Sequence, residues 1–339
     1  MNSKKKIALI IDTQGWAFHN IANQLSKHLS STYEIDIIPG DIFHGNMVKL
    51  FIYCQKYDLI HFLWRGYLSL IDNENMDNYI KSIGYQKEEF YKNYIYSKKI
   101  TTTVCDHLYL NEAEFFRTNE IFKFVNNYTV TSKKIYDIYY DIEGIKNPQQ
   151  IIHDGVDLNL YIPNNLSRFD SLKNLTVGWV GNSKFTDSDM DSDLKGLRTI
   201  IIPAIEELKA DGYDIILKTA DRNDGMIEQK DMPNYYNSID LYICASKTEG
   251  TPLPILESMA CGIPIISTDV GIVKECFGKE QSKYIIEERS KEALKDKIKE
   301  LYSKKERLKE LSCENLEQVK QYSWENIAAQ YGVFFENNL

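Results

Sequence analysis

The stretch EGTPLPILESMACGIPIIST, residues 249–268, decides the fold assignment because it sets two carboxylates around a well-marked turn into a helix. Glu249 and Glu257 flank two prolines, and a glycine follows them. Proline suits the first turn of a helix, and glycine suits the position just past its end. We therefore expect a helix that begins near Pro254 and ends near Gly262, with Glu257 about one turn inside it.

The residues before this stretch, IDLYICAS (239–246), form a short apolar run that is typical of a buried strand. Glu249 then follows the carboxyl end of a strand, where ligands bind in open parallel sheets. The side chain of Glu257 leans toward the helix N-terminus and so borders the same space. Free N–H groups at that helix end suit a phosphate, and the two carboxylates suit hydroxyls. A nucleotide-sugar has this layout of hydroxyls at both ends and phosphate between them.

Short apolar runs alternate with helical patterns along the chain, which predicts an α/β fold with doubly wound parallel sheets. The expected strands are residues 6–12, 33–39, 57–64, 100–106, 128–132, 175–181, 213–220, 239–246 and 263–268. The expected helices are 18–29, 112–126, 197–212, a charged region at 290–321, and an amphipathic helix at 321–338 that Ser323 caps. The length of 339 residues favours two domains, and the polar, turn-rich segment 155–174 is the predicted linker.

The composition excludes several classes of protein. A net charge of −9 disfavours nucleic-acid binding. No apolar run reaches the ~18 residues of a membrane-spanning helix, and IALII near the N-terminus is too short for a signal peptide. The six cysteines lack disulfide or zinc spacing, which predicts reduced, mostly buried thiols and a cytoplasmic location.

Residues 249–271 closely resemble the E-x7-E signature of the family 4 retaining glycosyltransferases, which have the GT-B fold of two Rossmann-like domains facing a cleft. GVDLNLYIP (155–163) is similar to the family's interdomain segment, and GWVGN…DLKGL (178–197) to its phosphate-binding segment. Residues 128–135, 232–246 and 322–328 also fit the family's pattern, in the family's order.

The resemblance implies a metal-independent enzyme without a cofactor, which moves a sugar from a nucleotide-sugar to an acceptor and retains the anomeric configuration. UDP is the expected nucleotide on base rates alone. Residues 1–155 would bind the acceptor and residues 156–321 the donor, while the helix at 322–339 would pack back on the first domain. The expected acceptor is a cell-surface polysaccharide, O-antigen or glycolipid intermediate, with peripheral contact to the inner membrane face left open. The sequence does not indicate an oligomeric state.

The resemblance also assigns roles to individual residues. Glu257 would hold the ribose hydroxyls, Glu249 would face the transferred sugar, and Lys195 would neutralise the departing diphosphate. The donor loop would comprise Gly250, Thr251, Pro252, Leu253 and Pro254, with the backbone N–H groups of Thr251, Leu253 and Ile255 as donors.

The sequence departs from the family's pattern at four places. Pro252 stands where glycine is frequent and removes one N–H donor. Asn182 replaces a phosphate-binding arginine, which makes Lys184 the candidate for a second cation. Only Gly15 remains of a Gly-Gly loop after the first strand. The family's active-site histidine falls on Cys105 or, with a local shift in the alignment, on His107; we favour His107.

Other interpretations remain beside these. Glu249 and Glu257 could be a capping acid and a solvated helix residue, and the acidic run 186–196 favours a solvated loop over a metal site. Residues 91–100 mix Tyr and Lys, which suits a membrane surface, although a helix covering the sheet is preferred. His61 is expected to be a satisfied core residue. The alternative functions are a GT-B sugar-nucleotide epimerase, for which no acid/base pair is evident, and a non-catalytic sugar-nucleotide-binding protein.

Overall fold

The computed structural model describes residues 3–106, 120–184 and 193–339. The chain divides into two compact units. Unit 1 comprises Met1–Asp154 and Trp324–Leu339, and unit 2 comprises Gly155–Ser323. Each unit is an α/β structure built on a parallel sheet, as the alternation of apolar runs predicted.

The described part of unit 1 contains a sheet with the strand order β2-β1-β3-β4-β5-β6. Its strands are β1 (Lys5–Ile11), β2 (Tyr33–Pro39), β3 (Leu59–Phe62), β4 (Lys99–Val104), β5 (Asn127–Val130) and β6 (Gln150–Ile151). Every neighbouring pair is parallel, with Ile7 aligned to both Ile35 and Leu59. Helices cover both sides of the sheet, so the interior strand β1 is buried and apolar on both faces from Ile7 to Ile11.

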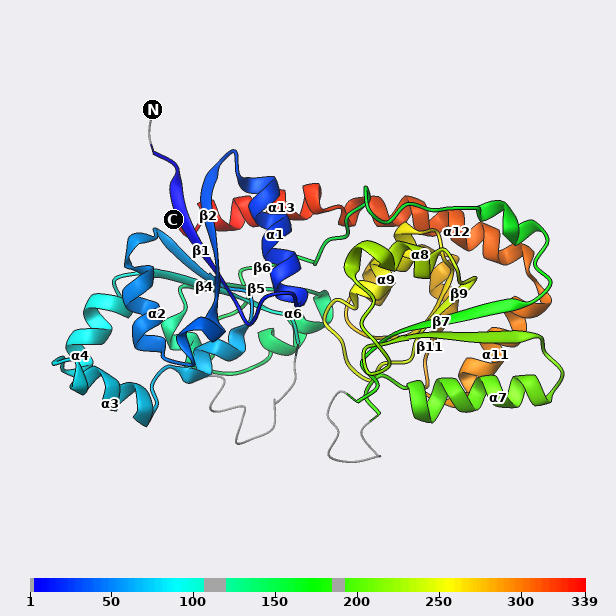
Figure 1. The fold of residues 1–339 in the computed structure, drawn as a ribbon, viewed down its shortest axis with the longest axis horizontal. Helices are drawn as coiled ribbons and strands as arrows, with labels where there is room; N and C mark the ends of the chain where they lie inside the picture. Colours follow the sequence, from blue (N-terminus) through cyan, green and yellow to red (C-terminus); the bar gives the residue numbers. More distant parts are fainter. Residues whose placement is uncertain (1–2, 107–119, 185–192) are drawn as a thin grey trace. The chain divides into compact units, whose positions relative to one another are not determined.

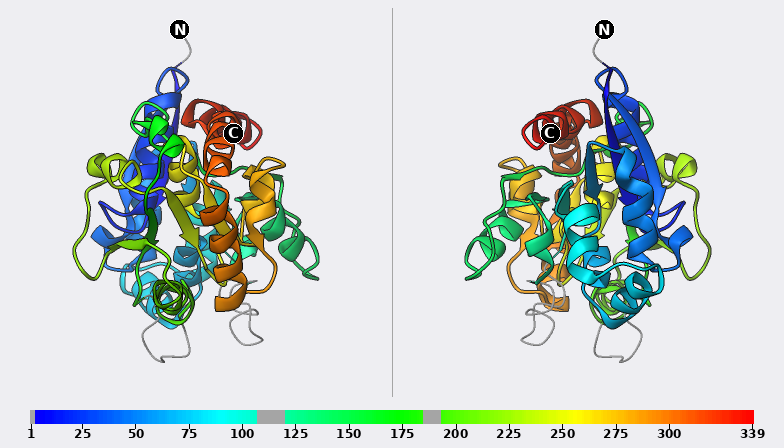
Figure 2. Two further views of the ribbon diagram at one scale, coloured as in Figure 1. Left: turned by 90° about the vertical axis from the view of Figure 1, so that its right-hand side faces the viewer. Right: turned by 90° about the vertical axis from the view of Figure 1, so that its left-hand side faces the viewer.

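Alternate residues of β1 enter two different cores of unit 1. Ile7, Leu9 and Ile11 pack with α1 (Ala17–Leu29) and α13 (Trp324–Glu336), which lie side by side (Figure 1 and Figure 2). Ala8 and Ile10 belong to the core on the other face. The helices of that face include α2 (Met47–Tyr53), α3 (Glu74–Ser82), α4 (Lys87–Phe90) and α6 (Lys133–Tyr140). The C-terminal helix thus lies in unit 1, far in sequence from the strands it covers.

His61 shows how β3 and β4 are joined to that C-terminal helix. Its ring is fully buried and its two nitrogens contact the hydroxyls of Thr101 and Thr103 at 2.9 and 3.1 Å. Thr103 also contacts the hydroxyl of Tyr331 at 3.1 Å. Burial lowers the pKa of His61 to about 3, so the ring is neutral. The expectation of a satisfied core histidine is confirmed.

The described part of unit 2 contains a parallel sheet with the strand order β11-β10-β9-β7-β8. Its strands are β7 (Leu175–Gly181), β8 (Ile215–Asp221), β9 (Leu241–Cys244), β10 (Ile265–Thr268) and β11 (Ile285–Ile286). One face packs against α7 (Ile202–Ala210), α11 (Lys291–Ser303) and α12 (Glu306–Gln318). The other packs against α8 (Met232–Tyr236), α9 (Leu253–Ala260) and α10 (Val273–Cys276).

The segment 155–174 differs from the linker that its composition predicted, because it is part of unit 2. Val156 and Tyr161 are each 2% exposed and belong to the core that contains α9, and Phe169 enters the other core. The N–H of Val156 donates to the carbonyl of Tyr322 at 2.9 Å, so the two ends of unit 2 are held together. The polar composition of the segment wrongly predicted a linker, because a few widely spaced apolar residues hold the segment in the cores of unit 2.

The remaining expectations have mixed outcomes. The region 290–321, expected to be helical and charged, contains two helices, α11 and α12, separated at Lys304 and Lys305. Of the helix expected at 112–126, residues 112–119 lie outside the described residues, and Ile121–Phe124 is a 3-10 helix. In the expected covering segment 91–100, Tyr91 and Ile95 are buried while Tyr96 is 59% exposed. All six cysteines are free thiols, of which Cys313 is exposed.

Two kinds of feature are absent from the described ranges. None of the helices there has the length and hydrophobicity that a membrane span requires. The same residues contain no group of three or more His, Cys, Asp or Glu side chains arranged for a metal ion. Most of the acidic run 186–196 lies outside these ranges, which end at residue 184 and resume at 193.

Candidate donor site in unit 2

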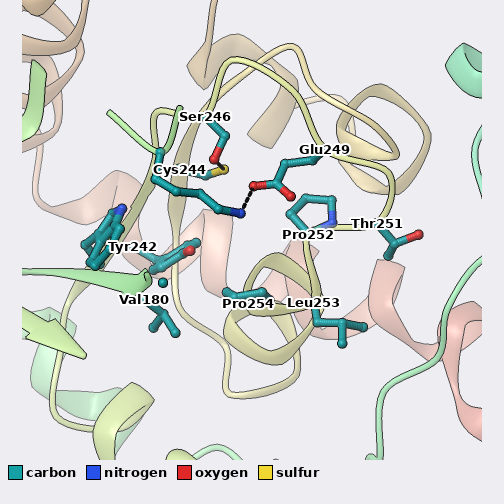
Figure 3. Close-up of a pocket in the computed structure, with 12 residues that line it drawn as sticks. Val180, Tyr242, Cys244, Ser246, Glu249, Thr251, Pro252, Leu253 and Pro254 are labelled. Atoms are coloured by element: carbon teal, nitrogen blue, oxygen red, sulfur yellow. Dashed lines mark hydrogen bonds and ion pairs between the residues drawn. The ribbon is translucent and has the colours of Figure 1, made fainter. Parts of the chain in front are cut away.

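A pocket of about 200 Å³ lies at the carboxyl ends of β7 and β9 in unit 2 (Figure 3). Glu249, Pro252 and Pro254 come from the loop after β9 and the first turn of α9, while Val180 and Tyr242 lie across from them. The full lining is Trp179, Val180, Gly181, Lys195, Tyr242, Cys244, Ser246, Glu249, Thr251, Pro252, Leu253 and Pro254. This is the position at which open parallel sheets bind ligands.

The loop after β9 is fixed by an unusually close backbone approach. Gly271 has a φ of +48°, and a Cβ on this residue would lie 1.8 Å from the carbonyl oxygen of Gly250. The N–H of Ile272 donates to the same oxygen at 3.1 Å. Pro252 then takes the extended conformation that precedes a helix, and Pro254 stands in the first turn of α9. These constraints place Glu249 and the N-terminus of α9 beside the pocket.

Lys195 and Glu249 form an ion pair within the pocket lining. The Nζ of Lys195 donates to Oε1 of Glu249 at 2.5 Å. Their side chains are 27% and 16% exposed, so the pair is largely shielded from water. A charge-assisted hydrogen bond of this kind is stronger than a neutral one. The pocket therefore holds one cation and one anion that already neutralise each other.

The loop that carries Lys195 is held against the end of β9 by three contacts. The guanidinium of Arg289 donates to the carbonyls of Ala245 and Asp193, at 2.8 and 2.5 Å. The N–H of Lys247 donates to the carbonyl of Leu194 at 2.8 Å. At Gly196 the φ is +72°, and a Cβ there would lie 2.4 Å from the oxygen of Ala245. Lys195 is therefore positioned by backbone contacts on both sides of it.

Glu257 lies one turn along α9, and its side chain is held by two phenols. The hydroxyl of Tyr161 donates to Oε1 at 2.7 Å, and that of Tyr236 donates to Oε2 at 2.5 Å. Burial raises the pKa of the Glu257 carboxyl, while the two hydrogen bonds oppose that rise. The pocket lining contains Glu249 but not Glu257, although both carboxylates act electrostatically on the buried Tyr242 of that lining. Glu257 therefore does not line the cavity that Glu249 lines.

The predicted phosphate contacts are only partly brought together. Thr251, Leu253 and Pro254 line the pocket, but the N–H of Ile255 donates to the carbonyl of Pro252 at 2.8 Å and is already used. The expectation of a third N–H donor there is wrong, because Pro252 initiates a turn that takes it. Gly250, within the same loop, is buried.

Asn182 and Lys184 follow β7 but do not line the pocket. The side-chain oxygen of Asn182 accepts from the N–H of Lys184 at 3.0 Å and from the side-chain amide of Asn223 at 2.9 Å. Lys184 itself is exposed. Both residues therefore lie near the carboxyl end of β7, as the pocket does, and the side-chain oxygen of Asn182 is already used by hydrogen bonds within the protein.

The candidates from the N-terminal half lie in unit 1. Gly15 has a φ of +81° in the loop between β1 and α1, and its N–H donates to Nδ1 of His19 at 3.1 Å. His107 lies outside the described residues. Cys105 follows β4 and is partly buried, and burial raises the pKa of its thiol well above the usual range. A neutral thiol of this kind is a poor nucleophile.

Sequence reasoning missed the residues that hold the predicted ones in place, namely Tyr161, Tyr236 and Arg289. Tyr161 stands within GVDLNLYIP and Tyr236 within MPNYYNSIDLYICAS, so both lie in recognised segments, but nothing local marks either as a partner of Glu257. Arg289 stands outside every motif. A cation at a helix N-terminus and a carboxylate with spare acceptor sites can together bind an anion that carries hydroxyls.

Comparison with known proteins agrees with this geometry. Residues 225–318, which include α8, β9 and α9, match the family described as "Glycosyl transferases group 1". A 113-residue segment is 30% identical to the lipopolysaccharide core biosynthesis mannosyltransferase LpsB of Rhizobium meliloti. That segment covers 32% of this chain and 32% of the relative, so the chain spans about a third of the curated relative it matches.

Among the similar solved structures, two that match over nearly the whole chain serve as examples. A sucrose-phosphate synthase from Thermosynechococcus elongatus has a TM-score of 0.69 at 17% identity, covering 98% of this chain and 99% of that one. The Anabaena protein Alr3699/HepE, in complex with UDP and glucose, has a TM-score of 0.69 at 14% identity, with 98% and 99% coverage. The chain therefore has the GT-B fold, and its residues 225–318 are similar to the family of group 1 glycosyl transferases.

Proposed function

We propose that the protein is a glycosyltransferase that moves a sugar from a nucleotide-sugar to an acceptor. The observation that carries this proposal is the pocket in which Lys195, Glu249 and the N-terminus of α9 meet at the carboxyl ends of β7 and β9. An ammonium group beside a helix N-terminus suits a diphosphate, because both offer positive charge. A carboxylate in the same pocket suits the hydroxyls of the sugar that the diphosphate carries.

In the proposed reaction, each of these groups has a distinct task. Lys195 and the N-terminus of α9 stabilise the charge that develops on the departing diphosphate. Glu249 accepts hydrogen bonds from the transferred sugar, and Glu257 accepts them from the ribose. Because Lys195 and the helix supply the positive charge, we propose that the reaction needs neither a metal nor a cofactor. We also propose that it retains the anomeric configuration, with the departing phosphate taking the acceptor's proton.

We propose UDP as the donor's nucleotide and a cell-surface polysaccharide or lipid-linked glycan as the acceptor class. The first rests on the complex of the Anabaena relative with UDP and glucose, and the second on the name of the Rhizobium mannosyltransferase. The acceptor would be bound by unit 1, which contains Gly15 and the segment near Cys105 and His107. The reaction would then take place in the cytoplasm, at the inner membrane face where the acceptor is membrane-linked.

A donor screen tests the function directly. UDP-, GDP-, ADP- and CMP-sugars are compared by thermal shift and by donor hydrolysis, with and without EDTA. A ligand at 100 times its Kd stabilises the folded protein by about 2.7 kcal/mol, which is readily measured. We expect UDP-sugars to stabilise the protein and Glu257→Ala to lose that effect, and EDTA to leave hydrolysis unchanged.

The control for this screen is Glu300→Ala, which removes a glutamate that also accepts from a buried tyrosine, Tyr284, at 3.3 Å but lies on α11. It should keep the thermal shift that the nucleotide-sugar causes in the wild type. A wild-type protein that no nucleotide-sugar stabilises would overturn the proposed function. If Glu300→Ala abolishes the thermal shift as completely as Glu257→Ala does, the loss is not specific to Glu257.

A further inference from the structure

The two phenols on Glu257 come from different parts of unit 2 and approach its carboxylate from separate elements. Tyr161 belongs to the segment that opens unit 2, and Tyr236 is the last residue of α8. Their rings are 6.0 Å apart and tilted by 62°. Each oxygen of the carboxylate receives one hydroxyl, at 2.7 Å from Tyr161 and 2.5 Å from Tyr236. The carboxylate is therefore held at both oxygens rather than at one.

The two phenols and the carboxylate they hold differ in their exposure to solvent. Tyr161 is 2% exposed and Tyr236 is fully buried, whereas Glu257 keeps a partly exposed side chain. A carboxylate has about four lone-pair positions, of which the phenols occupy two. Two lone-pair positions therefore remain for a ligand. Two acceptors fixed close together match the two hydroxyls of a vicinal diol.

Both phenols remain donors under ordinary conditions. Burial and the nearby charge of Glu257 raise the pKa of Tyr161 and of Tyr236 well above the usual range for a phenol. Each phenol must be the donor in its hydrogen bond with Glu257, because an ionised carboxyl group can only accept. The hydrogen bonds in turn favour the ionised form of Glu257, against the burial that raises its pKa. The two phenols thus orient the carboxyl group and oppose the rise in its pKa.

Holding the Glu257 side chain in one orientation should strengthen ligand binding, because a glutamate side chain is otherwise flexible. Fixing such a side chain at the moment of binding costs about 1.5–2 kcal/mol of rotamer entropy. A group that is already ordered avoids this cost when the ligand arrives. The ring contact of Tyr236 with Tyr242, 6.3 Å between centroids, links the arrangement to the pocket lining.

We propose that Tyr161 and Tyr236 are positioning residues that present the Glu257 carboxylate to the ribose diol of the donor nucleotide. This inference rests on the proposed function of the same site. It goes beyond that function because it assigns the ribose selectivity of the site to two residues that do not touch the ligand. A purely structural role for the phenols would affect stability without affecting which ribose is preferred.

The test compares UDP with 2′-deoxy-UDP by calorimetric titration. The wild type should bind 2′-deoxy-UDP about 10- to 100-fold more weakly, since one hydrogen bond to a charged group is lost. Tyr161→Phe and Tyr236→Phe keep the rings and remove only the hydroxyls. Each should weaken UDP binding about five- to tenfold and affect 2′-deoxy-UDP less, so that the discrimination shrinks.

The matched control is Tyr284→Phe, which removes another buried hydroxyl, 1% exposed and bonded to Glu300, outside the pocket lining. It should keep the wild-type discrimination, while Glu257→Gln should lose most of it. Unchanged discrimination in both Tyr161→Phe and Tyr236→Phe, with Glu257→Gln impaired, would overturn the inference and leave the proposed function standing. Failure of the wild type to bind UDP would overturn this inference together with the proposed UDP donor, whereas the proposed function itself is overturned only when no nucleotide-sugar of the donor screen binds. Should one phenylalanine variant not fold, the other decides the matter alone.

Discussion

Replacing Lys195 by methionine removes the ammonium group and keeps an unbranched side chain of similar length. The lost contact is the 2.5 Å hydrogen bond to Glu249, between side chains that are 27% and 16% exposed. A hydrogen bond between charged, shielded groups contributes about 1.5–3 kcal/mol, so the free energy of unfolding should fall by about that amount. The larger effect should be on turnover, because a cation that meets developing charge is worth about 10²–10³ in kcat.

The assay is steady-state transfer, or donor hydrolysis, at saturating nucleotide-sugar, with thermal unfolding measured on the same samples. The double variant Lys195→Met with Glu249→Gln separates the two effects. It removes the unpaired carboxylate and should recover stability, but it should not recover kcat. The expected pattern is therefore a stability loss that is reversible by the second substitution and a catalytic loss that is not.

Lys247→Met is the matched control, because Lys247 is exposed on the neighbouring loop and its backbone N–H, not its side chain, contacts Leu194. A surface substitution of this kind should leave kcat within about twofold of the wild type. A Lys195→Met protein with near-normal kcat would refute the electrostatic role of Lys195. Equal losses in the two variants would show a general dependence on surface charge instead.

Three further outcomes are expected. Gly271→Ala should destabilise the protein more than Gly84→Ala and should also weaken donor binding. The Cβ at residue 271 would lie 1.8 Å from the carbonyl oxygen of Gly250, whereas the Cβ at residue 84, also at positive φ, meets nothing within 4 Å. Equal losses of stability in chemical denaturation would contradict this prediction. The pKa of His61 is lowered from 6.5 to about 3 in the folded protein, so the unfolded chain binds the extra proton and stability should fall as the pH drops through that window. The fall should be shallower in His61→Gln, and parallel pH curves for the two proteins would exclude His61 as its source. Thiol titration of the native protein should show one rapidly reacting group, Cys313, that disappears in Cys313→Ser; a rapid phase that survives would identify another accessible thiol.

The sheets could be predicted from the sequence because buried parallel strands are short, nearly continuous apolar runs. The run at 175–181 coincides with β7, and that at 6–12 differs from β1 by one residue at each end. The two-residue strands β6 and β11 were not predicted, since two residues carry no periodicity. The fold class therefore followed from the interior strands, while the sheet edges did not.

The site could be predicted only as far as its motifs extend. Proline and glycine positions located α9 and hence Glu257, because these residues constrain the backbone locally. The partners of Glu257 were invisible, since Tyr161 is 96 residues away in sequence and nothing near it records the contact. Arg289 is likewise 96 residues from Asp193. Residues that position others are tied to them only by the tertiary fold, which a local pattern does not encode.

The ion pair between Lys195 and Glu249 has a consequence for selectivity in the proposed reaction. Where a diphosphate takes the place of Glu249 at Lys195, the carboxylate, only 16% exposed, needs another donor. Leaving a buried charged group unpaired costs more than the lost bond itself. The hydroxyls of a transferred sugar can supply that donor, whereas a free nucleoside diphosphate lacks this sugar and its ribose hydroxyls are the ones proposed for Glu257. An acid beside the cation thus lowers the affinity for phosphate alone and favours the complete nucleotide-sugar, because selectivity depends on the difference between the two binding energies.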